Sequence, residues 1–128
     1  MSSKVVEQIE ELFAQREHLA EDIIINKQTV VDLDRKRNGN REGLNQIKKN
    51  LKDKEKKVWL NFGDMFIRLP TNDAQEIIEQ DQNTLNEKID QSRKIIKEKA
   101  NELQQLEGKK GMQGFDLEGM TAKELYNI

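Results

Sequence analysis

The chain contains no cysteine, one proline and one histidine among its 128 residues. Without cysteine it has no disulfide bond and no thiolate nucleophile or metal ligand, which suits a reducing compartment. The one histidine, His18, leaves no histidine cluster for a metal ion and no Ser–His or Cys–His catalytic pair. The chain's many carboxylates lie among lysines at helical spacing, as on ordinary exposed helix faces. The sequence therefore predicts no catalytic residue, no cofactor and no metal site.

Long apolar runs are missing as well. Hydrophobic residues make up 34% of the chain and charged residues 36%, whereas a typical soluble domain has about 45–50% and about 25%. No apolar run approaches the roughly 20 residues of a membrane-spanning helix, and the N-terminal residues contain no secretory apolar region. This composition favours long, solvated helices in a single domain or subunit. We expect a protein of the cytoplasm, and secondarily of the nucleus, that binds neither a membrane nor a small-molecule substrate.

Aromatic residues are scarce, at 5% of the chain, and three of them lie in one strand-like stretch, residues 58–69. Its sequence, VWLNFGDMFIRL, predicts a β-hairpin with a type II′ turn at Gly63-Asp64, because glycine accepts the positive φ of the first central position. Side chains alternate along a strand, so six apolar residues share one face. An isolated hairpin is marginal in water, and we therefore predict that another chain covers this face as an oligomer interface. The expected pairs are Val58–Leu69, Leu60–Ile67 and Phe62–Met65 on the interface face, and Trp59–Arg68 and Asn61–Phe66 on the other.

Apolar residues recur at alternating spacings of four and three over residues 5–51 and again over residues 78–106. A heptad spacing kept in phase over such lengths indicates the seam of a coiled coil. The first helix would be roughly 70 Å long and the second roughly 50 Å. Pro70 lies between them, and residues 71–73 form a suitable N-cap for the second helix. The predicted seam residues are Ile9, Leu12, Leu19, Ile23, Val30, Leu33, Leu44, Ile47, Ile78, Leu85, Ile89, Ile96 and Leu103.

The weak place in the first helix is residues 35–43, where Gly39 and Gly43 each cost about 1 kcal/mol relative to alanine. The apolar spacing resumes in the same phase after this segment, which favours one continuous helix, with a kink as the alternative. Arg37 and Asn40 occupy seam positions here. Polar seam residues either set the register or the partner of a coiled coil or mark a frayed, hydrated section, and the sequence leaves both interpretations open.

Charge is uneven along the chain although the net charge is only −2. Residues 1–34 have three basic and eight acidic side chains, while residues 35–57 have ten basic and three acidic. Basic side chains at this density can contact phosphates. However, Asp53 and Glu55 interrupt the basic run, and no aromatic residue is interleaved for base stacking. We interpret the segment as an exposed helix face, with nucleic-acid binding as the less favoured alternative.

Residues 108–128 are glycine-rich, and we expect them to form a flexible C-terminal tail after a coiled-coil domain of residues 1–107. Apolar side chains in this tail would make a short docking motif, the alternative being a disordered terminus. The candidate docking residues are Phe115, Leu117, Leu125 and Tyr126.

The order of long helix, β-hairpin and long helix resembles the β-type prefoldin subunit over residues 5–107. A closer resemblance is to the PDRG-type prefoldin-like proteins, the DNA-damage-regulated branch of that family. It rests mainly on Asn-Arg-Glu-Gly-Leu at 40–44 and Phe-Gly-Asp-Met-Phe-Ile at 62–67, with further support from residues 31–34 and 114–117. The resemblance implies a mainly α fold, in which a hairpin joins the helices of a long antiparallel two-helix coiled coil.

In that family the hairpins of several subunits join into a β-barrel from which the coiled coils extend. The resemblance implies a non-enzymatic chaperone or co-chaperone subunit, with other prefoldin or prefoldin-like subunits as partners and proteins as clients. For the PDRG-type branch it implies a module associated with the R-two-TP co-chaperone, with URI and UXT among its subunits, that aids folding or assembly of complexes such as RNA polymerase. The alternative is a self-associating coiled-coil adaptor that binds no clients.

Overall fold

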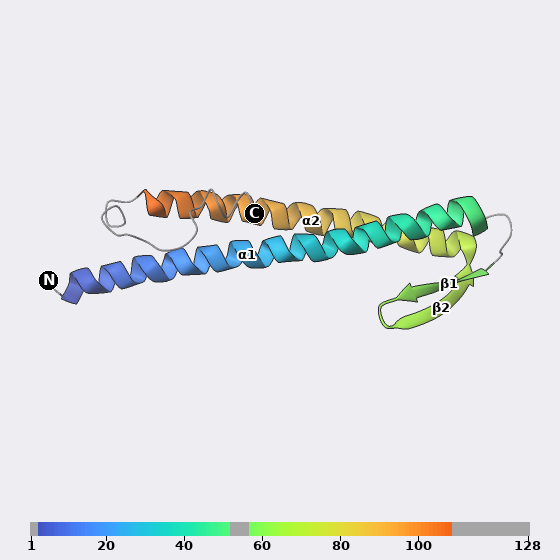
Figure 1. The fold of residues 1–128 in the computed structure, drawn as a ribbon, viewed down its shortest axis with the longest axis horizontal. Helices are drawn as coiled ribbons and strands as arrows, with labels where there is room; N and C mark the ends of the chain where they lie inside the picture. The colour runs from blue at the N-terminus through green and yellow to red at the C-terminus, as the bar shows by residue number, and fades with distance from the viewer. Residues whose placement is uncertain (1–2, 52–56, 109–128) are drawn as a thin grey trace. The chain divides into compact units, whose positions relative to one another are not determined.

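The computed structural model describes residues 3–51 and 57–108. Helix α1 covers Ser3–Gln46 and continues into a π-helical turn, η1, at Ile47–Leu51. Strands β1 (Lys57–Phe62) and β2 (Met65–Pro70) form an antiparallel hairpin, and helix α2 covers Thr71–Glu107 (Figure 1). The predicted fold class, mainly α with a hairpin between two long antiparallel helices, is confirmed. Within the described ranges, no helix is long and apolar enough to cross a membrane.

Helix α1 runs without a break through the segment of residues 35–43. Neither Gly39 nor Gly43 has a positive φ, so both adopt a conformation that any residue can take. The prediction of a continuous helix across this segment is confirmed. The prediction that α-helical winding continues to Leu51 is wrong, because η1 has the wider π winding where the chain leaves the helix toward β1. Ile47, the first residue of η1, is nevertheless buried as a seam residue should be.

The chain divides into two compact units, and each unit contains part of α1 and part of α2. The first unit combines residues up to Val31 with residues from Asp90 onward. Its helices are antiparallel, since Arg16 of α1 pairs with Glu107 of α2, and Asp22 pairs with Lys99. A hydrophobic cluster fills the seam between them. Its buried members are Ile23, Ile96, Ala100 and Leu103, with Leu19, Ala20 and Val30 packed against them.

The second unit is Asp32–Ile89, which contains the remaining parts of the helices and the hairpin. Arg37 of α1 contacts Asn86 of α2, and Asn40 contacts Asp81, so the helices are antiparallel here as well. Helix α2 begins directly after Pro70, which has no N–H to continue the strand pairing, and places Asp73 in its positively charged first turn. The buried apolar residues of this unit are Ile47, Ala74, Ile78, Leu85 and Ile89.

Candidate functional site

The hairpin turn has the predicted geometry. Gly63 has a φ of 63°, and Asp64 has no positive φ. A type I′ turn needs positive φ at both central residues, whereas a type II′ turn needs it only at the first. The turn is therefore type II′, and it fixes the register of the two strands. All five predicted cross-strand pairs are present, and the pairing extends by one more pair, Lys57 with Pro70.

The two faces of the hairpin differ in exposure. Val58, Leu60, Ile67 and Leu69, four of the six predicted interface residues, are half-buried by their own chain. Met65, the fifth, is 62% exposed. The side chain of Phe62, the sixth, lies outside the part of the chain that the structure describes. Use of this face as an oligomer interface stays a prediction.

The opposite face exposes two aromatic rings. Trp59 is 68% exposed and Phe66 is 70% exposed. The register places Trp59 opposite Arg68 and Phe66 opposite Asn61. The two aromatic residues are thus diagonal neighbours on one face, a separation that large side chains can bridge. Side-chain alternation predicted that Trp59 and Phe66 share this face, but the sequence analysis assigned neither residue to an interface.

A groove of about 640 Å³ lies where the hairpin meets both helices of the second unit. Leu60 lines it from β1, and Leu33 and Leu85 line it from α1 and α2. Gly39 and Gly43 also line it, and an added Cβ at Gly39 would meet no atom within 4 Å. Asn61, on the opposite face of the hairpin from Leu60, lines the groove as well, whereas Trp59 and Phe66 remain mostly exposed.

A set of polar side chains, which we call the polar layer, joins α1 to α2 beside this groove. Arg37 Nη1 donates a hydrogen bond to Asn86 Oδ1 at 3.0 Å, and Gln82 Nε2 donates to the backbone oxygen of Arg37 at 3.0 Å. Asn40 Nδ2 donates to Asp81 Oδ2 at 2.7 Å. The polar layer consists of Arg37, Asn40, Asp81, Gln82 and Asn86.

These bonds decide between the two interpretations of the polar seam residues. Each bond joins one position of α1 to one position of α2, so a shift of either helix by one turn would break all of them. Within the described residues, the buried atoms Arg37 Nε and Gln82 Oε1 have no hydrogen-bond partner. An unsatisfied buried polar atom costs stability, so the layer is better suited to fixing the register than to strengthening the coil. The structure favours the register-setting interpretation over a frayed section.

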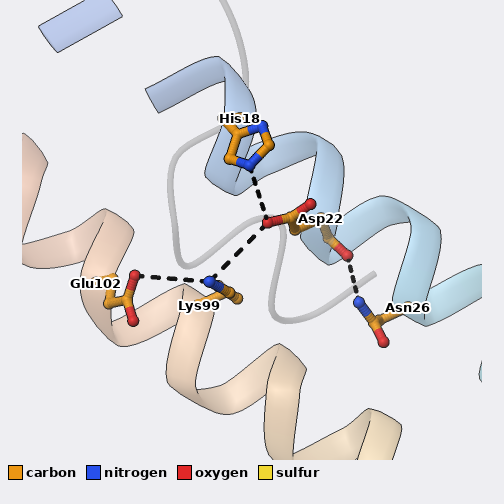
Figure 2. A network of polar contacts seen from close by, with 5 residues as sticks. All are labelled: His18, Asp22, Asn26, Lys99 and Glu102. Carbon is orange, nitrogen blue, oxygen red and sulfur yellow. Dashed lines mark hydrogen bonds and ion pairs between the residues drawn. The ribbon is translucent and has the colours of Figure 1, made fainter. Parts of the chain in front are cut away.

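The first unit has a polar network on its surface (Figure 2). The Asp22 carboxylate lies 3.7 Å from His18 Nε2 and 4.0 Å from Lys99 Nζ, and Lys99 also lies 4.0 Å from Glu102. Asn26 Nδ2 donates to the backbone oxygen of Asp22 at 2.8 Å. The His18 side chain is 75% exposed, as expected for a surface histidine. Exposed ion pairs of this kind add little stability, and we assign the network no chemical role.

The predicted seam residues lie at the helix–helix contact to different degrees. Arg16, a polar residue at a seam position, is buried and lies 3.7 Å from Glu107 Oε1. The buried seam residues are Ile23, Ile47, Ile78, Leu85, Ile89, Ile96 and Leu103. The partly buried seam residues are Ile9, Leu12, Leu19, Val30, Leu33 and Leu44.

Other predicted functional residues are exposed or lie outside the described residues. Arg35, Lys36, Arg41, Lys48 and Lys49 of the basic segment are exposed, whereas Arg37 is part of the polar layer. In the part of the chain that the structure describes, no group of three or more histidine, aspartate or glutamate side chains could hold a metal ion. The candidate docking residues of the tail, Phe115, Leu117, Leu125 and Tyr126, fall outside the described residues.

Comparison with known proteins finds relatives by sequence. A protein of Bos taurus named "p53 and DNA damage-regulated protein 1" is 44% identical over 82 residues, which are 64% of this chain and 61% of that protein. The protein of the same name from Homo sapiens is 42% identical over 83 residues, 65% of this chain and 62% of that protein. The match thus spans about three fifths of the length of these curated relatives. No family model and no solved structure matches the chain.

Proposed function

This chain is a relative of the PDRG-type proteins, and on that premise we propose that it is a non-enzymatic subunit of a hetero-oligomeric prefoldin-like complex. Its relatives are named for regulation by p53 and DNA damage, a property of those proteins that we extend to this chain as part of the proposal. Its partners are other prefoldin or prefoldin-like subunits, and the complex acts in the cytoplasm and nucleus as a chaperone or co-chaperone that aids assembly of other protein complexes, RNA polymerase among them.

The observation that carries this proposal is the exposed pair of aromatic residues on the hairpin. Trp59 and Phe66 lie on one face of a sheet that has only two strands in the described chain, so each strand also has an edge with no partner strand. Unpaired edges and exposed aromatic rings together favour addition of strands from another chain. The hairpin thus offers both backbone hydrogen-bonding groups and apolar surface to a neighbouring subunit.

The polar layer supports the same assignment. It fixes which residues of α1 and α2 face each other. This happens at the hairpin end of the coil, because Asn40 and Asp81 also line the 640 Å³ groove beside the hairpin. A fixed register holds the hairpin in one position relative to the helices of its unit, and a defined position is what a repeated interface between subunits requires.

Native mass measurement of the tagged full-length chain, purified from the cells that produce it, tests the proposal. The expected result is a complex that contains this chain with different prefoldin-like subunits. Recovery of this chain only as a monomer or with copies of itself would contradict the proposal and favour the self-associating adaptor. Recovery with nucleic acid, lost as salt is raised, would instead favour the basic segment as the functional surface.

Variants of both faces of the hairpin test whether the hairpin is the interface. Replacing both Trp59 and Phe66 by serine should weaken partner binding about 100-fold or more, since each buried aromatic ring contributes about 1.5–3 kcal/mol. Ile25→Ser on α1, at a residue 54% exposed, is the control and should bind normally. Leu60→Asp or Ile67→Asp should abolish assembly and leave the helices formed by far-UV circular dichroism. Normal assembly of all these hairpin variants would exclude the hairpin as the interface.

A further inference from the structure

The first unit contains an open groove of about 530 Å³ between α1 and α2, which we call the coil groove. Ile24 and Val31 of α1 line it, and each is 51% exposed. Ile96 of α2 and Val30 of α1 add further apolar surface. Scattered apolar residues are normal on a protein surface, but apolar residues gathered around one concave site mark a place where another segment binds.

The coil groove also contains positive charge. Lys27 and Arg93 line it from opposite helices. Burial beside the apolar residues lowers the pKa of Lys27, because a partly desolvated ammonium group is disfavoured. A segment that brings both apolar side chains and carboxylates into the groove would fill its apolar surface and place negative charge beside these two cations.

The tail of the same chain has this combination of residues. Residues 115–118 read Phe-Asp-Leu-Glu, so apolar and acidic side chains alternate, and an extended segment would direct them to opposite sides. The length of the connecting chain also fits. From Ile96 to Gly108 the axis of α2 rises about 18 Å, whereas residues 109–115 can span about 23 Å when extended. The chain can therefore return along α2 and place Phe115 at the coil groove.

We propose that residues 115–118 bind in the coil groove of their own chain, with Phe115 and Leu117 on its apolar surface and Asp116 and Glu118 against Lys27 and Arg93. All of these groups lie in one polypeptide, so the contact requires no partner subunit and is independent of the proposed function. It covers apolar surface of the coil that is otherwise exposed to solvent.

Disulfide formation between introduced cysteines tests this directly, because the natural chain has none. One full-length variant combines Gln28→Cys in the coil groove with Gln113→Cys in the tail. The matched control combines Ala14→Cys with Gln113→Cys. Ala14 is exposed and lies near Arg16, whose partner Glu107 directly precedes Gly108, so it is close to the start of the tail.

A tail that moves freely reaches the nearer cysteine more often, so the control would react faster. A tail bound in the coil groove reverses this order, and we expect the Gln28 variant to form its intramolecular disulfide about tenfold faster than the control. Adding Phe115→Ala and Leu117→Ala should remove the preference. A faster reaction in the control, or disulfides that link two chains, would overturn the proposal.

Charge exchange provides a second test in the same cysteine background. Lys27→Glu with Arg93→Glu should remove the preference for Gln28, and further change of Asp116→Lys with Glu118→Lys should restore it. Restoration also shows that the first pair of changes did not unfold the helices. If the preference for Gln28 is lost and not restored in a variant that keeps its far-UV dichroism, the acidic residues do not contact these cations.

Discussion

Replacing Gly39 and Gly43 by alanine, singly, should stabilise the chain. Both glycines lie inside α1 without positive φ, where alanine is favoured over glycine by about 1 kcal/mol. An added Cβ at Gly39 meets no atom within 4 Å, so that variant measures helix propensity alone. At Gly43 the new Cβ would lie 3.9 Å from Ile78 Cδ1, an ordinary contact. We expect Gly43→Ala to gain slightly more than Gly39→Ala, because it also covers part of a buried isoleucine.

Urea unfolding followed by circular dichroism, with melting as a second measurement, provides the assay. A gain of about 1 kcal/mol corresponds to an increase in Tm of about 3–5 °C for a chain of this size. Gly63→Ala is the control with the opposite sign, since Gly63 has a φ of 63° and a left-handed alanine costs about 1–2 kcal/mol. Stability should thus rise at two glycines and fall at the third.

Loss of stability in both Gly39→Ala and Gly43→Ala would refute the continuous helix. The groove offers a further comparison, because both glycines line it beside Leu60. If a partner subunit also entered this groove, the added methyl groups would stabilise the isolated chain and weaken the complex. Measurement of both quantities for each variant separates an effect on the helix from an effect on assembly.

Three further predictions concern single residues. Asn40→Leu should lower the free energy of unfolding by about 1–3 kcal/mol, because the Asp81 carboxylate loses its amide donor. Adding Asp81→Leu should recover most of this loss in urea titrations. No recovery would contradict an energetic coupling between Asn40 and Asp81. Ile23→Ala, at a fully buried site, should lower the free energy of unfolding by about 2–5 kcal/mol. The control Ile25→Ala should change it by less than about 0.5 kcal/mol. Equal losses of stability in the two variants would be inconsistent with the burial of Ile23. Burial lowers the pKa of Lys27 below its usual 10.5, so the folded chain loses this proton at a lower pH than the unfolded chain. Lys27→Met should therefore be more stable than the natural chain at neutral pH, and the difference should shrink as pH rises through the folded pKa toward 10.5; a difference that is constant with pH would exclude this cause.

The hairpin register was predictable because two local rules act together. Gly63 selects the turn type, and once the turn is fixed the alternation of side chains assigns every residue from Val58 to Leu69 to a pair and a face. Likewise, the heptad phase across residues 35–43 outweighed the two glycines, since their combined cost of about 2 kcal/mol is smaller than the burial of seam residues on both sides. Rules that use only near neighbours along the chain were sufficient for these features.

Contacts between distant segments were not predictable in the same way. The polar seam residues Arg37 and Asn40 were identified from spacing, but their partners on α2 depend on how the two helices align. The heptad spacing continues to Leu51 and gave no sign of the π winding at η1. The exposure of Trp59 and Phe66 depends on which face of the hairpin the helices cover, and a period of two defines the faces without assigning either to the helices.

A hairpin with apolar residues on both faces has a consequence for stability. Leu60 and Ile67 on one face are half-buried, whereas Trp59 and Phe66 on the other face remain mostly exposed. Burying both rings would contribute about 3–6 kcal/mol, a large part of the 5–15 kcal/mol that stabilises a typical domain. The isolated chain forgoes this contribution, and a neighbouring subunit on the aromatic face would provide it. Its Tm should therefore rise with the concentration of that partner, and a Tm of the natural chain that is unchanged by a bound partner would show that the rings are not buried on assembly.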